Sequence, residues 1–257
     1  MLTAVPFEPL PEVVSGDDLG ELIWHAISHR HPHGWRPTPE RLDHGDILVI
    51  AHKVVSKAEG RVRSLAEVVP SAQAIELAGD RDPRLVQVVL DETREIVRAS
   101  PGVIVCETHH GFVCANAGVD QSNVPGDDTV LMLPRDPDAS ARAIRARISE
   151  LTGVAPGIVI TDSFGRAWRT GQSDVAIGLA GVAALDDWRG RVDAAGREML
   201  ATVIAVADLL AATADLARRK DAGQPVVLIR GAEEYVSAED GPGVKPLLRE
   251  RSLDLFR

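Results

Sequence analysis

Two acidic stretches about forty residues apart carry the side chains best suited to bind a metal ion. Asp120 ends a β-like run that begins near residue 111, and Asp162 follows the apolar run 157–161. A strand end holds a carboxylate in a fixed place, and carboxylate oxygens are preferred ligands of Mg²⁺ and Mn²⁺. One such Asp is also ordinary turn chemistry. Two of them together favour a site for a divalent cation and a phosphate.

Cationic residues follow a third apolar run, at 47–50. Lys53, Lys57 and Arg61 lie close together after this run and form the most cationic spot in the first half of the chain. A lysine at a strand end can contact a nucleotide phosphate as a point charge. A solvated strand end explains the same pattern equally well.

A second cationic group lies in the segment 165–174. Arg166 and Arg169 flank a tryptophan, and glycines bound the group on both sides. Guanidinium groups in this setting suit a carboxylate or phosphate ligand better than an apolar core. A wholly exposed loop is the alternative.

The histidines and cysteines favour simpler explanations. The segment 29–44 has histidines at metal-ligand spacing, but its prolines and polar residues favour a solvated loop. Histidines 109–110 lie at a predicted hairpin tip, where they could face a substrate or simply be exposed. Cys106 and Cys114 are predicted to be small buried residues in a reducing compartment, rather than a disulfide or a metal pair.

Composition limits the kind of protein. The chain has 257 residues, 45% of them hydrophobic, with a formal net charge of −10. It can bury a sizeable core, and nucleic acid is an unfavourable partner for so acidic a chain. The first residues lack a basic, apolar leader, and no apolar stretch is long enough to span a membrane. We therefore expect a cytoplasmic protein that needs metal ions to handle phosphates.

The elements that position these residues mix irregularly. Apolar runs predict strands at 47–50, 103–107, 111–115, 129–133, 157–161 and 226–230, and 3.6-residue periodicity predicts helices over about 19–26, 85–97, 141–151 and 196–219. Helices and strands do not alternate strictly, and the glycine-rich nucleotide loops are absent. We therefore predict one α+β domain over 1–257, with mixed sheets and packed helices, and neither a Rossmann fold nor a P-loop.

Three long motifs resemble the coenzyme F420-0:L-glutamate ligase family, also called F420:γ-glutamyl ligases. They lie at 52–61 (HKVVSKAEGR), 115–123 (ANAGVDQSN) and 161–172 (TDSFGRAWRTGQ). Weaker matches continue to the C-terminus, so the resemblance covers nearly the whole chain in order. It is closest to the stand-alone form that lacks a nitroreductase-like domain, and it implies the α+β fold peculiar to this family.

The resemblance also implies an activity and a homodimer. Members use GTP and divalent cations, Mg²⁺ or Mn²⁺ with K⁺ as a further candidate, to join L-glutamate to the F420 precursor and extend a γ-linked chain. By motif match the metal ligands are Asp120, Asp162 and Ser163. The GTP contacts implied in the same way are Leu10, Pro11, Glu12, Val13, His52, Lys57 and Asn123. Arg166 and Arg169 are candidates for holding a carboxylate or phosphate on chemical grounds alone.

Departures from the family pattern leave alternatives open. His52 stands where serine is usual, and Val203 and Leu209 replace two glutamates in a segment predicted to be helical. The histidine-rich insertion 29–44 is longer than usual. A divergent ligase acting on another carboxylate or amine fits these changes, as does a nucleotide-binding protein without catalysis.

Overall fold

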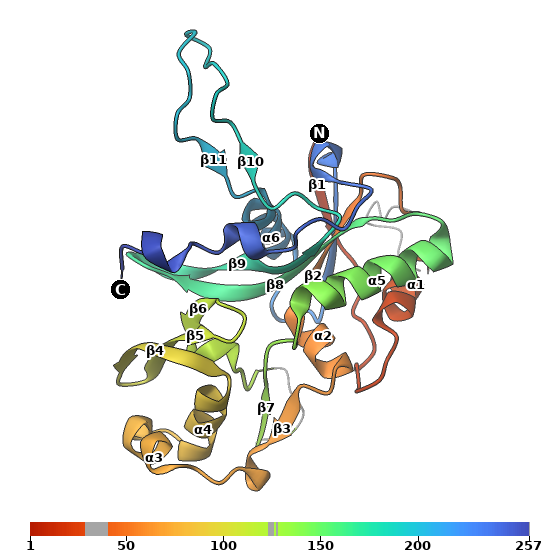
Figure 1. Cartoon of the computed structure of the whole chain (residues 1–257). Coiled ribbons are helices and arrows are strands. Elements are labelled where there is room, and N and C mark those ends of the chain that lie inside the picture. The colour runs from red at the N-terminus through yellow and green to blue at the C-terminus, as the bar shows by residue number, and fades with distance from the viewer. Residues whose placement is uncertain (29–40, 123–125, 127, 257) are drawn as a thin grey trace.

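Five strands form the main sheet of the computed structural model, which describes residues 1–28, 41–122, 126 and 128–256 (Figure 1). Their spatial order is β1 (Thr3–Pro6), β12 (Val226–Arg230), β2 (Ile47–Ala51), β8 (Gly157–Arg166) and β9 (Arg169–Ala180). Neighbours are antiparallel except β2 and β8, which are parallel. The central strands are apolar and buried almost throughout, as expected where both faces of a sheet are covered.

Three helices pack on this sheet. They are α1 (Leu19–Ser28), α5 (Pro137–Thr152) and α6 (Val206–Ala217). Helix α1 packs against α5, and both α5 and α6 contact β9. Local chemistry sets the ends of α5: the Asp136 side chain accepts the Ala139 amide at 2.9 Å, and Gly153 closes the helix in the left-handed conformation.

A smaller lobe lies beside the main sheet and has its own apolar clusters (Figure 1). It contains the two-stranded sheet β3–β7, two helices and the three-stranded sheet β4–β5–β6. The bounds are β3 (Val62–Ser64), α3 (Ala72–Ala78), α4 (Pro83–Asp91), β4 (Thr93–Ser100), β5 (Val103–Thr108), β6 (Val113–Ala115) and β7 (Thr129–Leu131). The molecule therefore has the predicted α+β organisation with mixed sheets and packed helices.

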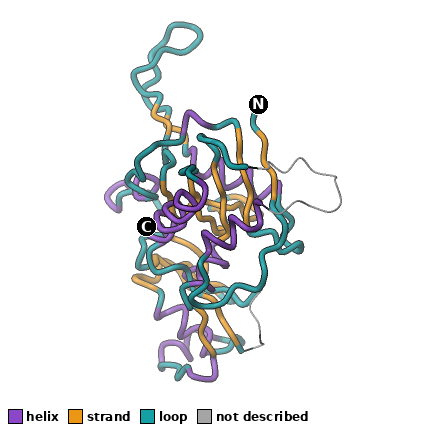
Figure 2. Tube along the Cα trace, turned by 90° about the vertical axis from the view of Figure 1, so that its right-hand side faces the viewer, coloured by secondary structure: helices purple, strands orange, loops and turns teal. Residues whose placement is uncertain are grey.

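A long hairpin projects from the body of the molecule (Figures 1 and 2). It begins and ends with β10 (Asp186–Asp187) and β11 (Val203–Ile204). The hydrogen bond from the Gly190 amide to the Met199 carbonyl, at 3.0 Å, continues the pairing toward the tip. Short 3₁₀ turns complete the fold at Leu65–Glu67, Asn116–Gly118, Glu233–Tyr235, Lys245–Leu247 and Arg251–Leu253. In the part of the chain described, no helix is long and apolar enough to cross a membrane.

Many predicted elements are confirmed. The structure contains the predicted strands at 47–50, 103–107 and 226–230 and the helices at 19–26 and 141–151, with ends shifted by a few residues. Cys106 and Cys114 are buried free thiols that face each other across β5 and β6. Burial raises the pKa of the Cys114 thiol to about 12, which makes it unreactive.

Other local predictions were wrong. The helix predicted at 85–97 ends at Asp91, because the β-branched residues after it pair with β5 as strand β4. The helix predicted at 196–219 begins only at Val206, because the preceding residues form one side of the projecting hairpin. The residues after β2 form helix α2 (His52–Ala58) rather than a solvated strand end. The segment 165–174 is not a wholly exposed loop: it spans the tip of the β8–β9 hairpin and the first part of β9, where Asp174 is buried.

Gly178 in β9 allows α5 to approach the sheet closely. A Cβ atom at this position would lie 2.5 Å from the carbonyl oxygen of Pro137, at the start of α5. We expect Gly178→Ala to lower the free energy of unfolding by about 1–3 kcal/mol, because the helix must move off the sheet. Urea unfolding measures this change.

Gly165→Ala in the adjacent strand is the matched control. A Cβ there has no neighbour within 4 Å, so we expect a change within about 0.5 kcal/mol. Equal losses in both variants would show that the close contact with α5 is not the cause.

Candidate functional site

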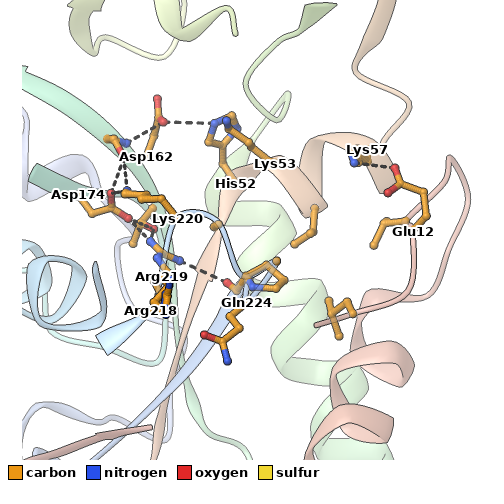
Figure 3. A pocket seen from close by; sticks show the side chains of 18 of the residues that line it. Glu12, His52, Lys53, Lys57, Asp162, Asp174, Arg218, Arg219, Lys220 and Gln224 are labelled. Atoms are coloured by element: carbon orange, nitrogen blue, oxygen red, sulfur yellow. Dashed lines mark hydrogen bonds and ion pairs between the residues drawn. The ribbon is translucent and has the colours of Figure 1, made fainter. Parts of the chain in front are cut away.

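A cavity of about 510 Å³ lies where several distant segments of the chain meet (Figure 3). Its walls come from the N-terminal segment, the junction of β2 and α2, the middle of β8, one residue of β9 and the connection from α6 to β12. The lining residues are 10–13, 51–54, 57, 161–163, 174, 218–220 and 223–225. Most of the residues implied by the resemblance therefore border a single cavity.

The parallel pair β2–β8 builds the centre of this site. Ala51 pairs with Thr161 at the end of β2, so the next residues lie side by side: His52 begins α2, and Asp162 continues in β8. The carboxyl ends of parallel strands commonly form ligand sites, because the chain changes direction there. His52 Nε2 lies 3.3 Å from Asp162 Oδ1 without the alignment of a hydrogen bond, and its side chain is only 3% exposed.

Asp120 is held in the smaller lobe by an unusual turn. Asn116, Ala117 and Gly118 all have positive φ, and the Asn116 side chain accepts the Ile104 amide at 3.1 Å. Two backbone hydrogen bonds between Asp120 and Leu131, at 2.8 and 3.0 Å, then fix the position of the carboxylate. The left-handed conformation is costly for residues with a Cβ, so the surrounding structure must impose this turn.

The first residues of α2 connect Asp120 with the cavity. Lys53 lines the cavity, and its Nζ lies 2.6 Å from Asp120 Oδ2 and 2.5 Å from Ser122 Oγ. Burial alone would raise the pKa of Asp120, but Lys53 and the Ser122 amide and hydroxyl outweigh it and lower the pKa. Asp120 itself is not among the residues that line the cavity.

A buried charge cluster forms the wall opposite α2. Asp174 is 2% exposed and accepts hydrogen bonds from Arg218, Thr161 Oγ1, Ser163 Oγ and Lys220 Nζ. Burial alone would raise the pKa of Asp174, but the positive charges of Arg218 and Lys220 and the Ser163 hydroxyl lower it overall. Asp174 is therefore a fully satisfied carboxylate that fixes Ser163.

Ser163 connects this cluster to Asp162. Its hydroxyl donates to Asp174 Oδ1 at 2.6 Å and accepts from Lys220 Nζ at 2.8 Å. Its backbone amide donates to Asp162 Oδ1 at 2.7 Å. The orientation of the Asp162 carboxylate is thus set by its own strand.

The N-terminal segment closes another side of the cavity. It contributes Leu10, Pro11, Glu12 and Val13 to the wall, the residues for which the resemblance implies GTP contacts. Glu12 pairs with Lys57 Nζ at 2.6 Å (Figure 3), and Lys57 is the more buried partner, with a side chain 12% exposed against 61%. A ligand anion that binds Lys57 therefore has to compete with Glu12.

Other candidate residues lie elsewhere. Arg166 and Arg169 are exposed at the tip of the β8–β9 hairpin and do not line the cavity; Arg166 donates to the Thr170 carbonyl at 3.1 Å. Histidines 109 and 110 lie against backbone carbonyls and not in the cavity. Asn123 and most of the histidine-rich segment 29–44 fall outside the described residues.

The donor set fits a hard cation that is shared with a phosphate. Asp120, Asp162 and Ser163 offer carboxylate and hydroxyl oxygens, the ligand type that Mg²⁺ and Mn²⁺ take. Across the described residues, no three His, Cys, Asp or Glu side chains gather into a ligand set of their own. Mg²⁺ commonly binds one or two carboxylates and completes its coordination with water and substrate phosphates.

Sequence reasoning missed the cluster around Asp174. Arg218, Arg219 and Lys220 are three consecutive cationic residues in an acidic chain, which was an available signal. Asp174 had no comparable signal, because its importance comes from burial against Arg218. Val203 and Leu209, the positions of the two missing glutamates, lie in β11 and α6 and do not line the cavity.

Removal of Arg218 tests the buried cluster. Arg218→Ala leaves Asp174 buried without its guanidinium partner, so we expect unfolding by urea to require about 3 kcal/mol less free energy. Arg219→Ala is the control, because Arg219 pairs with Asp221 in solvent, where ion pairs contribute little to stability. Similar losses in the two variants would contradict a special role of the buried pair.

Comparison with known proteins identifies the family of the chain. Residues 9–231 match the family described as F420-0:Gamma-glutamyl ligase. Two relatives named coenzyme F420:L-glutamate ligase, from Methanopyrus kandleri and Methanothermobacter thermautotrophicus, are 44% and 45% identical to the chain, covering 100% of it and 99% of themselves. One of the same name from Methanocaldococcus jannaschii is 46% identical over 84% of this chain and 86% of its own length. The chain therefore belongs to the F420-0:gamma-glutamyl ligase family.

Proposed function

We propose that this protein is a ligase that joins L-glutamate to the F420 precursor F420-0 and extends a γ-linked glutamate tail, using GTP and a divalent cation. Family membership over most of the chain is the observation that carries this proposal. The cavity supports it, since different elements bring three carboxylates and three lysines to its wall: Glu12, Asp162, Asp174, Lys53, Lys57 and Lys220.

The chemistry requires activation of a carboxylate. A carboxylate oxygen of the precursor would attack the γ-phosphorus of GTP, forming an acyl phosphate and releasing GDP. The amine of L-glutamate would then attack the acyl carbon, and phosphate would leave as the amide forms. Both steps gather negative charge in one place, so they need fixed positive groups.

The cavity residues can meet these needs. Lys57 and Lys220 present ammonium groups that suit phosphate oxygens, once their carboxylate partners give way. Asp120, Asp162 and Ser163 would hold Mg²⁺ or Mn²⁺, which supplies charge neutralisation of the triphosphate. Leu10, Pro11 and Val13 offer an apolar wall on which part of the nucleotide can pack.

Other parts of the proposal rest on the resemblance alone. They are K⁺ as a further cation, the homodimer and the Asn123 contact to GTP. A role for Arg166 and Arg169 in holding a carboxylate or phosphate is proposed on chemical grounds alone. Because both arginines lie outside the cavity wall, such a role requires a substrate long enough to reach the hairpin tip, or a second subunit.

Product analysis tests the proposed reaction. With GTP, Mg²⁺ or Mn²⁺, the precursor and L-glutamate, we expect GDP release and a product heavier by one glutamyl unit or more, detected by mass spectrometry. Omission of any one component, or EDTA, should abolish both signals. Turnover with another carboxylate or amine but not with these two would instead show a divergent ligase, and binding of GTP without any turnover would show a non-catalytic protein.

Charge removal tests the proposed metal ligands. We expect Asp120→Asn and Asp162→Asn each to reduce the rate at least about a hundred-fold, since loss of an electrostatic group at the reacting centre typically costs 10²–10³. Asp80→Asn, an exposed residue far from the cavity, should keep normal activity. Retained activity in either of the first two variants would refute the metal assignment for that residue.

A further inference from the structure

Lys53 occupies the position at Asp120 that a metal ion would need. Its Nζ lies 2.6 Å from Asp120 Oδ2 and 2.5 Å from Ser122 Oγ, and the Ser122 hydroxyl in turn donates to Asp120 Oδ2 at 2.9 Å. The ammonium group thus bridges the carboxylate and the residue two positions after it. Asp120 is fully paired in this arrangement.

The other proposed carboxylate ligand is paired differently. Asp162 Oδ1 accepts the Ser163 amide, and His52 Nε2 lies nearby without forming a hydrogen bond. Asp162 lines the cavity directly, whereas Asp120 is reached through Lys53. The two carboxylates therefore differ in how readily they can accept a cation.

Both oxygens of Asp120 already have partners, since Oδ2 holds the Lys53 ammonium at 2.6 Å and Oδ1 accepts the Ser122 amide at 2.7 Å. A divalent cation at Oδ2 therefore competes with the ammonium group for the same oxygen. Mg²⁺ binds oxygen at about 2.0–2.1 Å, so it would lie well within repulsive range of an ammonium that stays on Oδ2. One of the two cations has to leave. Lys53 has somewhere to go, because its side chain is 24% exposed and forms part of the cavity wall.

We propose that Lys53 is an exchangeable counter-ion of Asp120. Without a divalent cation it neutralises Asp120, and when the cation binds, its ammonium moves into the cavity and contacts the phosphates of the nucleotide. This inference rests on the metal and nucleotide site of the proposed function. It assigns Lys53 a positioning role in the free protein and a phosphate-binding role in the loaded protein.

The exchange couples the binding of the two ligands. The metal ion must displace Lys53, so Lys53 weakens metal binding when no nucleotide is present. The nucleotide gains a lysine contact only after the metal has bound, so each ligand strengthens the binding of the other. A lysine that stayed on Asp120 in both states, or on the phosphates in both states, would produce no such coupling.

Calorimetry with Mn²⁺ alone gives the first test. We expect Lys53→Met to bind Mn²⁺ at least about tenfold more tightly than the unchanged protein. The reason is that Mn²⁺ no longer has to displace the charge-assisted hydrogen bond from the Lys53 ammonium to Asp120. Arg63→Met is the matched control: Arg63 forms an ion pair of the same 2.6 Å length with Asp91 in the smaller lobe, and its loss removes the same charge. The control should not alter Mn²⁺ affinity.

GDP binding gives the second test. In EDTA, Lys53 stays on Asp120, so Lys53→Met should change GDP affinity less than about threefold. With Mn²⁺ present, the same variant should bind GDP at least about tenfold more weakly, since it lacks the released ammonium. Lys53→Gln should repeat both results, which guards against a folding defect peculiar to methionine, and thermal unfolding checks both variants.

The outcomes separate this inference from the proposed function. If the unchanged protein binds Mn²⁺ and Lys53→Met binds it equally or more weakly, the exchange is refuted while the metal site stands. An equal loss of GDP affinity with and without Mn²⁺ also refutes it, because Lys53 would then contact phosphate in both states. If the unchanged protein binds no Mn²⁺ even with GDP, the metal site and the exchange both fail.

Discussion

The parallel pairing of β2 with β8 is the constraint on which the site depends. It joins segments more than a hundred residues apart in register, and it buries their apolar side chains in the middle of the main sheet. The pairing of β2 with β8 ends at Ala51 and Thr161, and the next residues lie together: His52 begins α2, and Asp162 continues along β8. A shift of the register by one residue would turn Asp162 to the opposite face of the sheet.

Charge compensation is the second feature that shapes the cavity. Three carboxylates around it have a cationic partner from a different part of the chain: Asp120 has Lys53, Glu12 has Lys57, and Asp174 has Arg218. These pairs differ in burial, and that difference separates their roles. The Asp174–Arg218 pair is buried and supports the cavity wall. The two lysine pairs are accessible from the cavity, so a charged ligand can replace one partner of each pair.

Sequence patterns predicted elements well where local chemistry and packing agree. Helix α5 has a capping Asp136 and a closing Gly153, and strand β2 is a short apolar run, so β2 was predicted to within one residue and α5 to within four. The helical pattern failed at 93–97 and 196–205, where apolar spacing suited a helix but strand pairing prevailed. Periodicity records which residues are apolar; it does not record whether another strand is available to pair with them.

The motifs alone determined the family and the α+β class, because they lie in long and distinctive segments, and most of the site residues that the resemblance implies border the cavity. Tertiary structure decided how these residues are paired. The sequence does not show that Lys53 reaches Asp120, that Asp174 is buried against Arg218, or that Arg166 and Arg169 point away at a hairpin tip. Such contacts join residues distant in the chain, and they exist only once the sheet and the smaller lobe have folded against each other.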